Sequence, residues 1–250
     1  MQISKYSASG NDFVIFHTFK KRDLTKLAIK LCDRQNGVGA DGLIALVPHS
    51  KYDFEWQFYN SDGSEANMCG NGSRAAAHYA FANSLADNSM SFLTLAGVIK
   101  ADVQNSMVQS DLTPPTILKE NIEEFDKNWL LIDTGVPHLI SFVENIDEFN
   151  INEARELRQK YNANVNIAYI NSDESIRVRT YERGVENETQ ACGTGMASAF
   201  YRAVKENLIG LKNTKVYPTS KETLYLGLEN ETIIFKGEVK KVFETTIDVI

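Results

Sequence analysis

The chain is poor in cysteine and lacks the residue spacing of a metal site or a disulfide framework. Only three cysteines, Cys32, Cys69 and Cys192, occur among 250 residues, and neither a Cys-x-x-Cys nor a His-x-x-x-His pattern is present. A zinc site usually needs four ligands with such clustered spacing, so we expect no metal. Because the cysteines are so few and no apolar signal segment is present, we expect free thiols rather than structural disulfides.

The chain also lacks the features that go with nucleic acid, membranes or nucleotides. Its net charge is −7 and it has no Lys/Arg-rich stripe, which argues against nucleic acid or an anionic membrane surface as a partner. No apolar run is long enough to cross a bilayer, and no signal segment is recognisable at the start. The Gly-Lys-Ser/Thr of a phosphate-binding loop is missing as well. We therefore expect a cytoplasmic protein that acts on a small molecule.

A repeated cysteine motif stands out against this background. The segment 68–72 (Met-Cys-Gly-Asn-Gly) recurs in altered form as 191–195 (Ala-Cys-Gly-Thr-Gly). Each copy opens an alanine-rich run that we expect to be a helix, over 73–83 and 196–207. A thiol at a helix N-terminus lies beside unpaired N–H groups and the positive end of the helix dipole, which favours the thiolate.

The elements that precede the two motifs are expected to follow the same order. Three features lie at nearly matching distances before the two cysteines. Before Cys69 they are the turn glycine Gly10, a strand from residue 43 and a period-two strand from residue 54; before Cys192 they are Gly135 and strands from residues 165 and 176. Such spacing predicts a duplicated chain. A further helix, capped by Asp23, is expected over 24–32 and would bury Cys32 as a small core residue.

The predicted fold class is α/β of the α+β type, with two pseudo-symmetric domains. Each domain is expected to be a curved sheet or barrel around a central helix, because each alanine-rich helix is small or apolar on nearly every face. Residues 1–113 would form the half with Cys69, and residues 114–250 the half with Cys192. The boundary is expected at 113–115 (Thr-Pro-Pro), and the last strand has the option of returning to the first half.

Two such thiols, facing one substrate, suit the inversion of a carbon stereocentre. One thiolate would remove the Cα proton from one face, and the other thiol would return a proton to the opposite face. N–H groups of both Gly-x-Gly turns would bind the substrate carboxylate as a two-sided oxyanion hole. A redox pair lacks its Cys-x-x-Cys motif, and a papain-like nucleophile leaves the duplication unexplained. The simplest alternative is a pair of tight turns that lead into buried helices.

Several segments resemble those of the diaminopimelate epimerase family and run in family order over nearly the whole chain. They are 9–13 (Ser-Gly-Asn-Asp-Phe), 37–42 (Gly-Val-Gly-Ala-Asp-Gly), 60–66 (Asn-Ser-Asp-Gly-Ser-Glu-Ala), 68–72, 136–138 (Val-Pro-His), 182–184 (Glu-Arg-Gly) and 191–195. The related proline racemases share the paired cysteines but usually carry Asp-Arg-Ser-Pro before the second one. The resemblance implies interconversion of LL- and meso-2,6-diaminopimelate, for lysine and peptidoglycan precursor synthesis, without pyridoxal phosphate, metal or any other cofactor.

The resemblance also implies roles for individual residues. Cys69 and Cys192 would be the acid/base pair, and His138 and Glu182 would support proton transfer. The implied substrate-binding residues are Asn11, Asn60, Gly70, Asn71, Asn166, Glu182, Arg183, Gly193 and Thr194.

The chain departs from the family pattern at two positions and in the loop 182–192, which is one residue longer than common through 186–187. Val136 stands where many members have asparagine, and Gly42 stands where some have a substrate-contacting glutamine. These departures leave open a narrower specificity for diamino acids. Two alternative functions also stay open, a proline or hydroxyproline epimerase and a non-catalytic amino-acid binding protein. A homodimer is compatible with the sequence.

Overall fold

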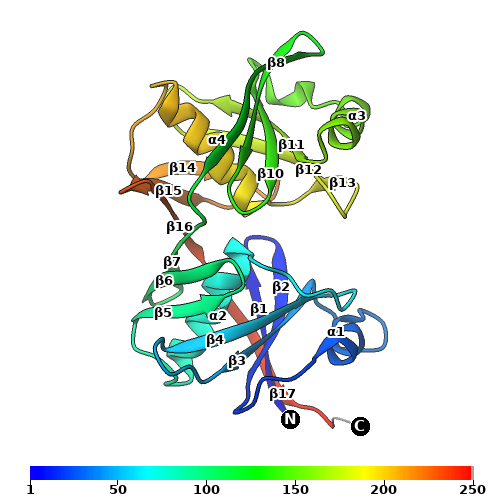
Figure 1. The fold of residues 1–250 in the computed structure, drawn as a ribbon, viewed down its shortest axis with the longest axis vertical. Helices are drawn as coiled ribbons and strands as arrows, with labels where there is room; N and C mark the ends of the chain where they lie inside the picture. The colour runs from blue at the N-terminus through cyan, green and yellow to red at the C-terminus, as the bar shows by residue number, and fades with distance from the viewer. Residues whose placement is uncertain (249–250) are drawn as a thin grey trace. The chain divides into compact units, whose positions relative to one another are not determined.

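The computed structural model describes residues 1–248 and divides into two compact units (Figure 1). Unit 1 comprises residues 1–110 together with the segment from 237 onward, and unit 2 comprises residues 111–236. We expected a boundary at 113–115, whereas the chain leaves unit 1 at 110/111, within a strand. It returns at 236/237, so the last long strand belongs to unit 1.

Unit 1 alternates strands with two helices. Its elements are β1 (Gln2–Ala8), β2 (Asn11–His17), α1 (Thr25–Cys32), β3 (Gly42–Val47), β4 (Phe54–Asn60), α2 (Gly70–Ala82), β5 (Ser89–Thr94), β6 (Gly97–Gln104), β7 (Met107–Asp111) and, from the end of the chain, β17 (Lys240–Thr246). From β1 to β7 each strand pairs with the next: antiparallel, parallel, antiparallel, parallel, antiparallel, antiparallel. The strand β17 lies antiparallel on the other side of β1.

Unit 2 repeats this arrangement. Its elements are β8 (Thr116–Glu124), β9 (Lys127–Asp133), β10 (Pro137–Phe142), the 3-10 helix η1 (Ile146–Glu148), α3 (Ile151–Tyr161), β11 (Asn164–Ile170), β12 (Ile176–Glu182), β13 (Asn187–Thr189), α4 (Gly193–Lys205), β14 (Thr214–Tyr217), β15 (Leu224–Glu229) and β16 (Thr232–Glu238). The strands β9, β10, β11, β12, β14, β15 and β16 pair in the same order of directions as β1 to β7. The strand β8 lies beside β9, as β17 lies beside β1.

This shared pairing order confirms the α/β fold with two similar halves that the spacing of the motifs predicts. In unit 1 the sheet is covered by α1 and α2 on opposite faces, because strand residues alternate in direction. Phe13 and Ile15 pack with the alanines of α2, whereas Val14 and Phe16 pack with α1. Cys32 belongs to the α1 cluster and is buried, as expected.

The helices α2 and α4 are buried on nearly every side. Strands of their own unit contact them, β1, β2, β3 and β6 in the case of α2 and β9 to β12 and β15 in the case of α4. Both helices begin three residues earlier than expected, because the cysteine itself occupies the N-cap and the glycines form the first turn. No helix within residues 1–248 is long and apolar enough to span a bilayer.

The start of α1 also differs from the expectation. Its N-cap residue is Leu24 rather than Asp23, although the Asp23 carboxylate still accepts a hydrogen bond from the Thr25 N–H at 2.9 Å. The carboxylate therefore satisfies a free N–H of the first turn from one residue further out.

Candidate functional site

The first cysteine lies at the N-cap of α2. Cys69 has an extended backbone (φ −152°, ψ 115°), and its Sγ accepts a hydrogen bond from the Gly72 N–H at 3.3 Å. A sulfur in this position receives both a backbone donor and the positive end of the helix dipole. The side chain is half-buried.

Asparagine side chains beside Cys69 are held in fixed orientations. The Asn71 amide is buried and donates to Asn11 Oδ1 at 2.7 Å, while its own oxygen accepts from Arg74 at 2.7 Å. Asn11 in turn donates to Asp41 Oδ2 at 3.0 Å. Two of the three predicted binding asparagines of unit 1, Asn11 and Asn71, are thus brought into direct contact, and Asn71 follows Cys69 and Gly70 in the chain.

Charged residues anchor the start of β2, where Asn11 lies. Arg34 donates to both oxygens of Asp12 at 2.9 and 3.0 Å and to Asp41 at 2.8 Å, and Lys5 lies 2.8 Å from Asp12. Burial by itself raises the pKa of Asp12, but the hydrogen bonds from Arg34 and Lys5 outweigh it and lower this pKa to about 2. Asp12 therefore stays ionised near neutral pH and holds the start of β2 in place.

Asn60 and Gly42 lie opposite each other on β4 and β3. Asn60 is exposed at the end of its strand and donates to Ser64 Oγ at 3.0 Å. A Cβ at Gly42 would lie 2.6 Å from the Phe58 ring and 2.9 Å from the Tyr59 carbonyl oxygen. Glycine is therefore the residue that this packing accepts, which gives a physical reason for the departure from glutamine.

The second cysteine lies at the N-cap of α4. Cys192 is extended (φ −126°, ψ 108°) and buried, and its Sγ lies 3.5 Å from the hydroxyl of Thr194. The same hydroxyl lies 2.8 Å from Nε2 of His138. The structure thus joins three predicted residues of unit 2 in one chain of contacts.

Strand register explains why His138 meets these residues. His138 on β10 is paired with Asn164 on β11, and Asn166 two residues later is paired with Thr180 on β12. The intervening Leu139 and Val165 pack with α3. Because side chains alternate along a strand, the four polar residues point to the other face, toward α4.

His138 is held neutral by its surroundings. Its side chain is fully buried, and burial lowers its pKa to about 3. The positive charge of Arg183 contributes in the same direction. The Asn166 amide nitrogen lies 3.1 Å from Nδ1. An uncharged imidazole is therefore the form present near neutral pH.

This histidine is expected to make stability depend on pH. Its folded pKa of about 3 lies below the ordinary value of 6.5, so the unfolded chain binds a proton that the folded chain does not between these values. The stabilisation is complete above pH 6.5 and falls as the pH drops, by up to about 1.4 kcal/mol per pH unit. Urea unfolding at pH 5 and 7 measures it, and a His138→Gln variant should lose less stability over that range. An equal loss in both proteins would contradict this assignment.

Asn166 is more enclosed than a substrate-binding residue needs to be. It is fully buried, and its amide contacts His138, the Leu139 carbonyl oxygen at 3.2 Å and the Thr180 hydroxyl at 2.8 Å. The structure therefore places it against His138 and Thr180, on the face of the sheet that turns to α4, and its contact with the distal end of a substrate stays a prediction. Such a position follows from the strand alternation, which the sequence analysis did not extend to this residue.

Asn164 is a site residue that the sequence analysis missed. Its oxygen accepts the Arg183 main-chain N–H at 2.7 Å, and its amide nitrogen lies 3.4 Å from Nε2 of His138. The Arg183 guanidinium donates to the Asn162 carbonyl oxygen at 3.0 Å, and Glu182 ends β12 half-buried. The signal for Asn164 was its place two residues before Asn166, on the same face of the strand.

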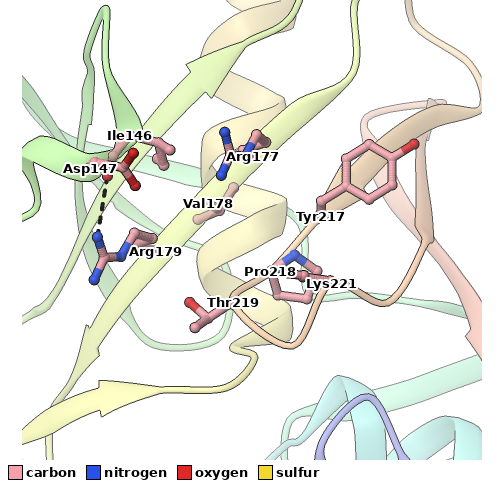
Figure 2. Close-up of a pocket in the computed structure, with 9 residues that line it drawn as sticks. All are labelled: Ile146, Asp147, Arg177, Val178, Arg179, Tyr217, Pro218, Thr219 and Lys221. Carbon is pink, nitrogen blue, oxygen red and sulfur yellow. Dashed lines mark hydrogen bonds between the residues drawn. The ribbon is translucent and has the colours of Figure 1, made fainter.

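A hollow of about 300 Å³ lies elsewhere in unit 2, beside β12 and the segment after β14 (Figure 2). Arg177 and Arg179 line it together with Asp147 and Lys221, and Arg179 is bound by the Glu188 carboxylate at 2.7 and 2.8 Å. None of the predicted site residues lines this hollow. Within residues 1–248 no group of three or more His, Cys, Asp or Glu side chains is arranged to hold a metal ion.

Solved structures share this fold at low sequence identity. A Bacillus anthracis protein of the PhzF phenazine biosynthesis family matches with a TM-score of 0.75 at 17% identity, covering 100% of this chain and 99% of the other. A hydroxyproline epimerase from Agrobacterium vitis matches with a TM-score of 0.73 at 13% identity, covering 98% and 91%. The protein thus has the duplicated fold of these epimerase and PhzF-type proteins.

Sequence relatives define the family. The sequence model of diaminopimelate epimerase matches residues 3–118 and 130–242. Proteins named diaminopimelate epimerase from Nitratiruptor sp. and Campylobacter lari are 63% and 53% identical, each over 98% of both chains. One from Helicobacter pylori is 42% identical over 97% of this chain and 94% of its own. The chain belongs to the diaminopimelate epimerase family.

Proposed function

We propose that this protein interconverts LL-2,6-diaminopimelate and meso-2,6-diaminopimelate by proton transfer at Cα, as a cytoplasmic enzyme of lysine and peptidoglycan precursor synthesis. The observation that carries the proposal is the pair of Cys-Gly-x-Gly motifs. Each places its cysteine at the N-cap of a buried helix in topologically matching positions. The choice of diaminopimelate as the substrate rests on the membership of the chain in the diaminopimelate epimerase family.

In this mechanism one cysteine acts as base and the other as acid. The thiolate takes the Cα proton and becomes a thiol, and the opposite thiol gives its proton to the other face and becomes a thiolate. Each turnover therefore leaves the pair ready for the reverse direction. Cys69 and Cys192 are these two residues, and no cofactor takes part.

Removal of the Cα proton leaves negative charge that is delocalised into the substrate carboxylate, and this charge needs stabilisation. The first N–H groups of a helix have no partner within the helix, and those of Gly70, Asn71, Gly193 and Thr194 stand at the start of α2 and α4. Oriented N–H donors at a site of developing negative charge are an oxyanion hole. We assign the carboxylate next to the reacting carbon to these groups.

The distal amino-acid centre of the substrate needs polar and charged side chains of its own. Arg183 is suited to a carboxylate, because a guanidinium presents parallel donors, and Glu182 and Asn60 are suited to an ammonium group. Asn164 supports this set by holding the Arg183 main chain. Asn11 contributes through its contact with Asn71.

A deuterium experiment tests the proposal. The protein is incubated with LL-diaminopimelate in deuterated water, and meso product and Cα deuterium are followed by NMR and chiral chromatography. We expect product with one deuterium at the inverted carbon and no activity toward L-proline or trans-4-hydroxy-L-proline. Turnover of a proline substrate alone would assign the chain to the other epimerase type. Binding of diaminopimelate without exchange would show a binding protein.

A further inference from the structure

The orientation of the Asn166 amide is fixed by the Leu139 carbonyl oxygen, and the Thr180 hydroxyl is compatible with it. Its nitrogen lies 3.2 Å from the Leu139 carbonyl oxygen, which only accepts hydrogen bonds. Its oxygen accepts from the Thr180 hydroxyl at 2.8 Å. The amide nitrogen must therefore be the group that faces Nδ1 of His138 at 3.1 Å.

A donor facing Nδ1 decides where the proton of a neutral imidazole sits. Nδ1 must accept, so the ring proton is on Nε2 and points to Thr194 Oγ1 at 2.8 Å. The contact of Asn164 with Nε2 is longer, at 3.4 Å, and leaves the Thr194 contact as the better one. The Thr194 hydroxyl accepts from the ring and keeps its own proton free to donate.

The sulfur of the second cysteine is an acceptor within reach of that proton. Cys192 Sγ lies 3.5 Å from Thr194 Oγ1, within hydrogen-bond reach for sulfur. Unit 1 has no such hydroxyl at the matching position. There Asn71 turns its side chain toward Asn11 and Arg74, and Cys69 receives a backbone N–H instead.

We propose that Asn166 is a positioning residue that holds His138 as the Nε2–H tautomer, so that the Thr194 hydroxyl donates a hydrogen bond to the Cys192 thiolate. Thr180 supports it by fixing the Asn166 oxygen. The proposal deepens the proposed function, on which its catalytic meaning rests. Its physical content, a tautomer and a hydrogen bond, requires no substrate.

Nitrogen NMR of the histidine rings tests the tautomer. In protein with ¹⁵N-labelled histidine, the His138 signals are assigned by their loss in His138→Gln. We expect the Nε2–H tautomer with no titration between pH 5 and 8. In Asn166→Asp the new carboxylate accepts from Nδ1, so the ring should change to the Nδ1–H or the doubly protonated form. Asn171→Asp, on a loop, should leave it unchanged. An Nδ1–H ring in the wild-type protein would overturn the proposal.

Carbon NMR of the cysteines tests the hydrogen bond. In protein with ¹³Cβ-labelled cysteine, each thiol reports its own ionisation, and buried Cys32 provides a reference because burial raises its pKa to about 12. Thr194→Val should raise the titration midpoint of Cys192 by about one pH unit, and Thr194→Ser should restore it. The midpoint of Cys69 should not move. An unchanged Cys192 midpoint in Thr194→Val would overturn the proposal, whether or not the protein turns over diaminopimelate.

Discussion

Replacing Cys69 by alanine is expected to slow epimerisation strongly and to leave hydrogen exchange with one epimer. In the proposed mechanism each thiol serves one face of Cα, so the variant keeps a base for one epimer and loses the acid on the opposite face. Epimerisation should fall by about 10²–10⁴-fold, while deuterium enters one epimer without inversion. Cys192→Ala should show the same loss with exchange into the other epimer. Each variant is incubated with LL- and meso-diaminopimelate in deuterated water. Chiral chromatography with mass spectrometry then measures the epimerisation and the deuterium content of each epimer.

The third cysteine provides the matched control. Cys32 is buried between α1 and the sheet of unit 1, so Cys32→Ala should keep the wild-type rate of epimerisation at a small cost in stability. Two outcomes would contradict the two-base scheme. One is exchange of the same epimer by both active-site variants, and the other is a wild-type rate in either of them.

The Gly195→Ala variant is expected to lose both stability and epimerisation rate, and this is the second large effect. A Cβ at this position would lie 2.3 Å from Asn166 Oδ1, 3.1 Å from Thr180 Oγ1 and 3.3 Å from His138 Cε1. These atoms belong to a buried network without free space, so α4 or the network must move. Overpacking of this kind costs about 2–3 kcal/mol of unfolding free energy. A displacement of Thr194 and Cys192 by even ~1 Å should lower the rate by about 10²-fold.

Two other glycines serve as comparisons for that variant. Gly210 has no atom closer than 3.8 Å to an added Cβ, so Gly210→Ala should change neither stability nor rate. Gly72, the counterpart in unit 1, has its nearest contacts at 3.3 to 3.5 Å, and Gly72→Ala should be intermediate. Urea denaturation and initial rates of epimerisation rank the three variants by stability and by activity. A Gly195→Ala protein as stable and active as Gly210→Ala would contradict the packing argument.

The sequence predicted the fold well because its strongest signals are local. The alanine-rich runs after each motif are apolar on nearly every face, and both form buried helices. The matching distances before Cys69 and Cys192 correspond to strands that pair in the same order. Helix starts were placed three residues too late, because glycine usually argues against a helix interior, whereas here it forms the first turn.

The structural features that the sequence does not predict depend on the pairing of strands rather than on a local pattern of apolar residues. The strand β8 is mostly exposed, alternates poorly and pairs with β9 through two register shifts, so it shows no period of two. The strand β13 has three residues and exists through its pairing with β12. The enclosure of Asn166 and the contact of Asn164 with Arg183 likewise follow from the register of three strands, which one sequence does not specify.

The position of α2 and α4 between parallel strands has a consequence for folding. α2 connects β4 to β5, and α4 lies in the connection from β12 to β14, and both strand pairs are parallel. A parallel pair closes only after its long crossover has been made, so these contacts form late. Each cysteine therefore lies in a connection that must be made before its parallel pair closes, Cys69 between β4 and β5 and Cys192 between β12 and β14. A protein lacking β14 would keep Cys192 and the whole sequence of α4, but the crossover that contains them would no longer end in a strand paired with β12.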